Sequence, residues 1–258
     1  VACGMPAFVA GMAEDLTKTV SPRRRLLATA VSASLAVWLL DSVIVRTDIP
    51  GLDTLIAMYP FAVALTIFSV TGVAHAVNII DGFNGLASMC VLIMLLALAY
   101  VAGQAGDIVM QTIAFAVAGA VIGFFILNFP AGLIFMGDGG AYVLGFLLAE
   151  VSILLLNRNA SVSPMFPLLV CAYPIFETIF TIYRRKVVRG TAVGAPDGIH
   201  LHTLIHRRLI RWNNGSTPQR RQTARNSMTS PYLWVLCLSS VIPAVLWWNN
   251  TPILGAFL

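Results

Sequence analysis

The chain has 258 residues, of which 58% are hydrophobic and only 10% are charged. Charged residues make up about a quarter of a typical soluble domain, so this composition excludes an ordinary soluble protein and indicates an integral membrane protein. The net charge of +5 does not indicate a nucleic-acid partner, because the basic residues gather in two loops beside apolar segments.

Apolar runs long enough to cross a bilayer as helices recur along the chain. They lack the in-out alternation of a transmembrane strand, so they predict an all-α, polytopic membrane helix bundle forming one domain over residues 1–258. Val1 lies inside a further apolar stretch, residues 1–12, and we expect a longer protein of which this is a part. The seven complete spans are expected at residues 27–45, 55–75, 88–103, 109–127, 140–156, 164–183 and 231–248.

The basic residues set the orientation of these spans. They lie before the first complete span and between the sixth and seventh, and the positive-inside rule makes that side cytoplasmic. The cytoplasmic loops are then residues 13–26, 76–87, 128–139 and 184–230, and each carries at least one carboxylate. We therefore expect a composite site at this face. Its acidic residues are Glu14, Asp15, Asp81, Asp138 and Asp197.

The first cytoplasmic loop contains adjacent carboxylates, Glu14 and Asp15, with Lys18 three positions after the second. Two neighbouring acids ionise together only when a cation or metal lies close, so the pair is a candidate for metal or proton chemistry. A solvated helix end is the alternative, and the local sequence leaves both open. The basic run Arg23–Arg25 is interpreted as a binding site for anionic lipid headgroups.

The second loop is an unusually polar insert between two spans. Asn78, Asp81 and Asn84 lie within seven positions, with Gly82 and Gly85 between and after them. Such a loop can hydrogen-bond a nucleobase, a sugar or a phosphate while its glycines keep it compact. A plain linking turn would not need both Asn78 and Asp81, so this pattern favours a functional loop.

The third loop ends in Phe135–Gly140, which reads Phe-Met-Gly-Asp-Gly-Gly. Its small residues would let a phosphate with a metal ion approach Asp138 closely. The alternative is a glycine turn between two membrane helices in which Asp138 is the N-cap. Two further acids, Glu150 and Glu177, lie inside spans, where a charge is costly and often marks function. A transporter that uses these two acids is the rival interpretation of the whole chain.

The long loop before the last span carries a cluster of histidines and basic residues. This composition could bind zinc or an anion, but no cysteine is near and the cluster is strongly basic. A diphosphate suits it better, since arginine and histidine both donate to phosphate oxygens. The residues are Asp197, His200, His202, His206 and Arg207.

Taken together, these four motifs resemble the polyprenyl-phosphate N-acetylhexosamine-1-phosphate transferase family, glycosyltransferase family 4. The resemblance covers essentially the whole chain. Glu14 stands where the family often has Asp, and Ala141 stands where Ser is common. The histidine loop lacks the triple His of the muramoyl-pentapeptide branch, which favours the N-acetylglucosamine branch. The matching residues are Glu14, Asp15, Lys18, Asn78, Asp81, Gly82, Gly85, Leu86, Gly137, Asp138, Asp197, His200 and His202.

The resemblance implies transfer of a sugar-1-phosphate from a UDP-sugar to undecaprenyl phosphate at the bacterial inner membrane. The protein would be surrounded by membrane lipids, and the resemblance leaves open whether it forms a homodimer. It implies Mg²⁺, with Mn²⁺ as the alternative, at Asp138. Asp15, Glu14 and Asp81 are then the catalytic carboxylates. The second alternative is that the chain is an inactive part of such a transferase. The implied substrate-binding residues are Lys18, Asn78, Asn84, Asp197, His200, His202, His206 and Arg207.

Overall fold

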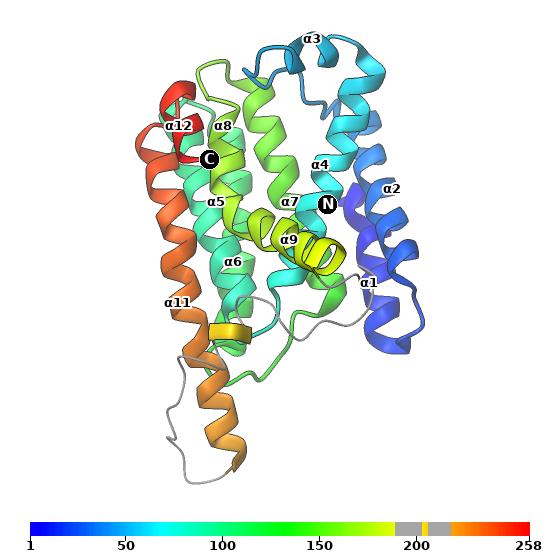
Figure 1. Ribbon diagram of the computed structural model, residues 1–258, viewed down its shortest axis with the longest axis vertical. Coiled ribbons are helices and arrows are strands. Elements are labelled where there is room, and N and C mark those ends of the chain that lie inside the picture. The colour runs from blue at the N-terminus through cyan, green and yellow to red at the C-terminus, as the bar shows by residue number, and fades with distance from the viewer. Residues whose placement is uncertain (189–202, 206–217) are drawn as a thin grey trace.

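The computed structural model describes residues 1–188, 203–205 and 218–258, and these residues form a bundle of helices without a strand (Figure 1). The predicted all-α membrane bundle is confirmed, and the protein is a multi-pass membrane protein. Within the described residues, five helical segments are long and apolar enough to cross a membrane. They are α4 (Tyr59–Ile80), α5 (Leu86–Gln104), α6 (Ile108–Asn128), α7 (Gly137–Arg158) and the part Arg225–Leu246 of α11 (Pro218–Leu246).

The first predicted span, residues 27–45, corresponds to α2 (Pro22–Leu40), which lies earlier in the chain. Pro22 suits the first helical position, and the side chain of Ser21 caps the helix by accepting from the backbone N–H of Arg24. The basic run is therefore the first turn of the helix rather than the loop before it. The smaller elements are η1 (Ala2–Gly4), α1 (Met5–Thr17), α3 (Leu52–Ile56) and α12 (Thr251–Phe257).

The sixth predicted span, residues 164–183, is not one helix. It is divided at Cys171 into α8 (Met165–Val170) and α9 (Ala172–Tyr183), and α9 continues into a π-helical turn, η2 (Arg184–Val188). Pro174 has no N–H to donate to the carbonyl of Val170, which removes the bond that would join the two helices. Figure 1 shows α9 lying across the bundle rather than along it.

The middle of the bundle is α5. Of the residues in its apolar window 72% are buried, against 22% for α6, so α5 is surrounded by protein while most of α6 faces outward. It packs against α6, α7, α8 and α11, and the main hydrophobic core gathers around it. This arrangement leaves α7 to form the second layer together with α1 and α4.

The helices α1 and α7 pack with their backbones in contact. A Cβ atom on Gly11 would lie only 2.5 Å from the Cα atom of Gly139, so a side chain does not fit there. Asp15 follows Gly11 by about one helical turn. The close contact therefore carries Asp15 to the first turn of α7, at the end of the bundle where α1 and α4 also end (Figure 1).

Candidate functional site

Asp15 holds the beginning of α7. Its carboxylate accepts hydrogen bonds from the backbone N–H groups of Asp138, at 3.0 Å, and Gly139, at 3.1 Å. These are unpaired donors of a helix N-terminus, and a capping carboxylate stabilises both. Lys18 lies 3.8 Å from the same carboxylate. The interpretation of Asp138 as the cap is therefore wrong, because Asp15 supplies the capping oxygens from another helix and Asp138 lies within the first turn.

Gly137 makes this contact possible. Its φ is +67°, a backbone conformation that suits glycine, and a Cβ atom there would lie 2.5 Å from a carboxylate oxygen of Asp15. The glycines around Asp138 were expected to let a phosphate approach the backbone. In the structure, the space in front of Gly137 is occupied by the Asp15 side chain instead.

The Asp138 carboxylate accepts hydrogen bonds from side chains on two other helices. One of its oxygens accepts a hydrogen bond of 2.9 Å from the side-chain amide of Asn78, on α4, and the other accepts from Nη1 of Arg25, on α2. The side chains of Arg25 and Asp138 are only 19% and 24% exposed. Arg23 and Arg24 are exposed, so the interpretation of this run as a lipid-binding patch is wrong for Arg25, whose guanidinium points into the site.

Asp81 lies directly after α4 and is the least compensated carboxylate of the group. Its side chain makes no hydrogen bond or ion pair with any residue in the described part of the chain. Burial raises its pKa to about 7, and the negative charges of Asp138 and Asp15 add to this effect. Three carboxylates therefore lie within electrostatic reach of one another at the start of α7, and their charges are not balanced.

Glu14 has a different position from its neighbour. One of its carboxylate oxygens accepts a hydrogen bond of 2.7 Å from the backbone N–H of Val20, and its carbonyl accepts one of 2.8 Å from the N–H of Lys18. These bonds close the turn that joins α1 to α2. The two adjacent acids are thus not equivalent, and the catalytic role of Glu14 stays a prediction.

Asn84, expected to bind substrate, is buried and 7% exposed. Its side-chain amide donates to the carbonyl of Pro130 at 3.3 Å and lies 3.4 Å from the hydroxyl of Ser227, and its backbone carbonyl accepts a 2.6 Å bond from the hydroxyl of Ser230. Asn84 therefore ties the loop before α5 to the loop after α6 and to α11. Its role toward a substrate stays a prediction.

Asn128, at the end of α6, is a residue that the sequence analysis did not single out. Its side-chain carbonyl accepts a 2.6 Å hydrogen bond from the N–H of Gly85, and its amide donates at 2.7 Å to the carbonyl of Ile134. Trp234 donates to the carbonyl of Gly85 from α11, at 3.0 Å. An asparagine at the end of an apolar span was the only local signal of this role.

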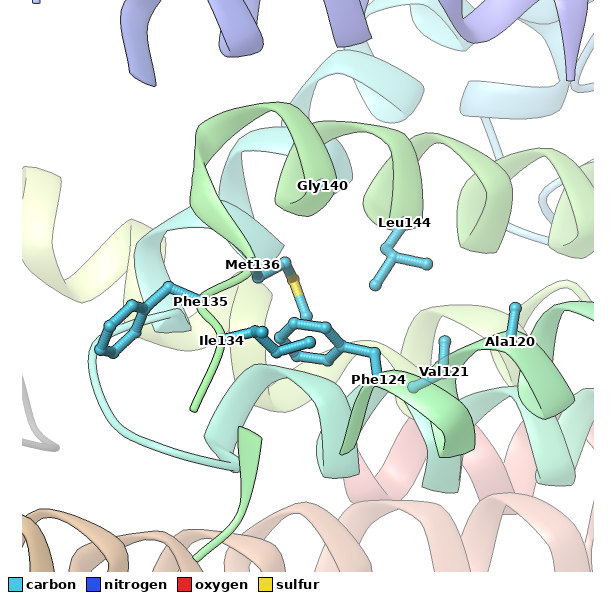
Figure 2. Close-up of a pocket in the computed structure, with 8 residues that line it drawn as sticks. All are labelled: Ala120, Val121, Phe124, Ile134, Phe135, Met136, Gly140 and Leu144. Atoms are coloured by element: carbon cyan, nitrogen blue, oxygen red, sulfur yellow. The ribbon is translucent and has the colours of Figure 1, made fainter. Parts of the chain in front are cut away.

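An apolar cavity of about 250 Å³ lies beside the site, between α6 and the start of α7 (Figure 2). It reaches Gly140, two positions after Asp138, and Phe135 points away from its other lining residues and is 78% exposed. The cavity adds no polar group to the site. Its lining residues are Ala120, Val121, Phe124, Ile134, Phe135, Met136, Gly140 and Leu144.

The remaining candidates are either distant or not described. Glu150 is buried in α7, about 18 Å along the helix from Asp138, and neither oxygen has a hydrogen-bond partner among the described residues. Glu177 is buried in α9. The histidine loop lies outside the described residues, so its predictions stay predictions. They concern Asp197, His200, His202, His206 and Arg207.

The donor set fits a magnesium ion that shares its ligands with a substrate. Among the described residues, no three His, Cys, Asp or Glu side chains lie close enough to hold a metal alone. Mg²⁺ usually binds one or two carboxylates and takes its other ligands from water and substrate phosphates. Asp138, with Asp81 nearby, meets that need. Burial first, and then the charges of Asp138 and Asp15, raise the pKa of Asp81, and a cation would offset those charges.

Comparison with known proteins connects this geometry to a family. Residues 1–156 match the sequence model of the family described as "Glycosyl transferase family 4", and this range contains Asp15, Asn78, Asp81 and Asp138. The chain belongs to this family. The resemblance drawn from the four motifs is thereby confirmed, and the carboxylate cluster at the start of α7 lies wholly within the matched part of this glycosyl transferase family member.

The similar proteins include two kinds of transferase. The chain is 34% identical over 142 residues to the "Probable undecaprenyl-phosphate N-acetylglucosaminyl 1-phosphate transferase" of Bacillus subtilis (strain 168), covering 55% of this chain and 39% of that protein. It is 29% identical over 208 residues to the "Undecaprenyl-phosphate alpha-N-acetylglucosaminyl 1-phosphate transferase" of Thermotoga maritima, covering 81% and 61%. The "Phospho-N-acetylmuramoyl-pentapeptide-transferase" of Streptococcus thermophilus (strain CNRZ 1066) is 41% identical over 95 residues, covering 37% and 28%. The chain thus spans less than two thirds of each of these relatives.

Proposed function

We propose that the chain belongs to an enzyme that transfers a sugar-1-phosphate from a UDP-N-acetylhexosamine to undecaprenyl phosphate and releases UMP. The donor is UDP-N-acetylglucosamine or a related UDP-sugar. The convergence of Asp15, Asp81 and Asp138 around the first turn of α7 carries this proposal, because such a cluster suits a cation and a diphosphate. The names of the N-acetylglucosaminyl relatives support the sugar and the lipid acceptor.

Asp138, with Asp81 beside it, would hold Mg²⁺, or Mn²⁺ in its place. When bound, the cation supplies charge neutralisation of the diphosphate and of the departing UMP. Asn78 holds the Asp138 carboxylate in place through its amide, and Asp15 fixes the turn from which Asp138 projects. These two residues therefore orient the carboxylate that would bind the metal.

The chemical step joins an oxygen of the lipid phosphate to the sugar-bearing phosphorus and breaks the bond from that phosphorus to UMP. A phosphate monoester has a second pKa of about 6, so it is largely ionised near neutral pH and needs alignment more than a base. Both oxygens of Asp15 already accept backbone N–H bonds, which suits a positioning role. Asp81, whose carboxylate has no hydrogen-bond partner among the described residues, is the one free to accept a proton. Its raised pKa belongs to the site without the cation, which would lower it.

We further propose that this enzyme lies in the bacterial inner membrane with the carboxylate cluster facing the cytoplasm, where it starts the synthesis of a cell-envelope polysaccharide. The distribution of basic residues supports this orientation. UDP-sugars are soluble and polyprenyl phosphates are membrane-bound. A cluster at the end of the bundle could therefore meet both substrates, whereas a site deep within the spans would exclude the first.

The test is UMP release. Membranes containing the protein receive undecaprenyl phosphate, Mg²⁺ and a panel of UDP-sugars, one at a time. We expect release from at least one UDP-N-acetylhexosamine, dependent on the lipid and abolished by a chelator, with a lipid-linked diphosphate sugar as the second product. Membranes without the protein are the control. Absence of release across the whole panel would contradict the proposed activity.

A further inference from the structure

The proposed metal ligand already has a cation beside it. Arg25 donates from Nη1 to one oxygen of Asp138, and both side chains are largely buried. Only this one nitrogen of Arg25 is bonded to the carboxylate, whereas an arginine that has settled on a carboxylate often makes two parallel bonds. Arg25 therefore holds Asp138 through a single nitrogen.

Two like charges on one carboxylate repel each other strongly in a partly buried place. A divalent cation at Asp138 and the guanidinium of Arg25 would compete for the same oxygens. Asn78 donates to the other oxygen of Asp138, and each oxygen keeps a second lone pair, so charge repulsion rather than a lack of acceptor sites sets the competition. Entry of a cation at Asp138 therefore favours movement of the Arg25 head group away from it.

Arg25 is built to make such a movement. Its Nε–H is buried and has no hydrogen-bond partner in the described part of the chain, so one donor of the guanidinium is unsatisfied in this position. Its backbone lies in the capped first turn of α2, and its long side chain can turn without moving the helix. The hydroxyl of Thr29, one turn further along α2, contacts the backbone carbonyl of Arg25 at 3.2 Å and Nε2 of His75 at 3.2 Å.

We propose that Arg25 is the resident counter-cation of Asp138, that a divalent cation exchanges with it there, and that the released guanidinium then donates to phosphate oxygens of the substrate. This inference rests on the proposed function. The phosphate is either the diphosphate of the UDP-sugar or the phosphate of the lipid, which present the same oxygens to a guanidinium. Arg25 is thus a positioning residue whose two states follow the occupancy of the metal site.

The first experiment measures Mn²⁺ binding to the purified protein in detergent, without substrate, by the electron paramagnetic resonance signal of free Mn²⁺. Arg25→Gln removes the competing charge and keeps a donor, so it is expected to bind Mn²⁺ about tenfold more tightly than the wild type. Arg24→Gln is the matched control, with the same charge change on an exposed neighbour, and stays within about twofold of the wild type. The gain disappears in an Asp138→Asn background.

Unchanged or weaker Mn²⁺ binding by Arg25→Gln overturns the exchange. If that variant does not fold, Arg25→Lys takes its place, because the shorter side chain weakens the contact and about threefold tighter binding is expected. Absence of Mn²⁺ binding in wild type and variants alike overturns the metal site itself. Absence of UMP release from every UDP-sugar overturns only the proposed activity, since the Mn²⁺ titration does not depend on turnover.

The second experiment separates the two phosphate sources. At saturating Mg²⁺, the KM of Arg25→Gln is measured for the UDP-sugar at fixed undecaprenyl phosphate, and then for the lipid at fixed UDP-sugar. An increase of about tenfold in one KM, with a smaller change in kcat, identifies the phosphate that Arg25 binds. Arg24→Gln leaves both values unchanged. If neither KM rises, Arg25 does not bind the substrate phosphate.

Discussion

The two ends of α7 use the same types of side chain to opposite effect. At its far end, Asp107 accepts from Arg158 at 2.7 and 3.2 Å, from Asn159 at 3.0 Å and from the N–H of Met110 at 3.1 Å. These donors, Arg158 above all, lower the pKa of Asp107 to about 2. At the near end, burial and neighbouring charges raise the pKa of Asp81 to about 7 instead.

The difference separates a structural ion pair from a candidate site. The Asp107 cluster is satisfied, and Arg46 extends it by donating to the carbonyls of Asn159, at 3.3 Å, and Val162. It locks loops together and has no evident need of a ligand. In the Asp138 cluster, the Asp81 carboxylate and Nε of Arg25 have no hydrogen-bond partner among the described residues, and a cation and a phosphate would supply partners for both.

The largest expected effect is on turnover, from a substitution in the Asp138 cluster at the start of α7. Asp138→Asn removes the charge that would bind the metal while keeping the size of the side chain, so UMP release should fall at least about 100-fold. The variant should insert and elute from size exclusion as the wild type does. Asp107→Asn is the control for loss of a carboxylate at the other end of α7, and its turnover at low temperature should be normal. Near wild-type activity of Asp138→Asn would remove that residue from the metal role.

A smaller effect, on thermal stability, is expected from a substitution in the Asp107 cluster at the far end of α7. Asp107→Asn deprives Arg158 of its partner and should lower the midpoint of thermal unfolding in detergent by several degrees. Asp41→Asn, on an exposed aspartate of an adjoining loop, is the matched control and should change it little. An unchanged midpoint in Asp107→Asn would show that the satisfied cluster contributes nothing to stability.

The smallest effect concerns pH and Asp81. Because its pKa is about 7 in the fold and 3.8 in the unfolded chain, its stabilising contribution is present below pH 4 and is lost as the pH rises through 7. Asp81→Asn lacks this dependence. With a chelator present, the variant should therefore gain stability relative to the wild type between pH 4 and pH 8, measured as the difference in unfolding midpoints. A difference that is constant over this range would refute the shift.

Hydropathy and loop charge predicted much of this molecule. Apolar length located the five long helices, and alternation placed Asp15, Asp81 and Asp138 on one face before any contact was known. Hydropathy did not predict the break at Cys171, because an average over side chains ignores the backbone hydrogen bond that Pro174 removes. The sequence shows Pro164, Pro167 and Pro174 in this stretch, but hydropathy does not measure their effect on the backbone.

Side-chain direction was the information that local sequence lacked. Three consecutive arginines look alike in a charge run, yet helical geometry turns Arg25 inward and leaves Arg23 and Arg24 exposed. The position of Asn84 depends on Ser227, which lies 143 residues further along the chain. Only the assembled bundle shows that Asn78 bonds to Asp138 while Asn84, from the same motif, ties three segments together.

The contact between Gly11 and Gly139 has a consequence for mutation. Every other amino acid carries a Cβ atom, so neither position has a conservative replacement. A methyl group on Gly11 would force α1 and α7 apart and draw the Asp15 carboxylate away from the turn that bears Asp138, and one on Gly139 would press on the backbone of Met12 at 3.0 Å. In a saturation screen for lost turnover, two residues with no chemistry of their own would therefore rank with the carboxylates.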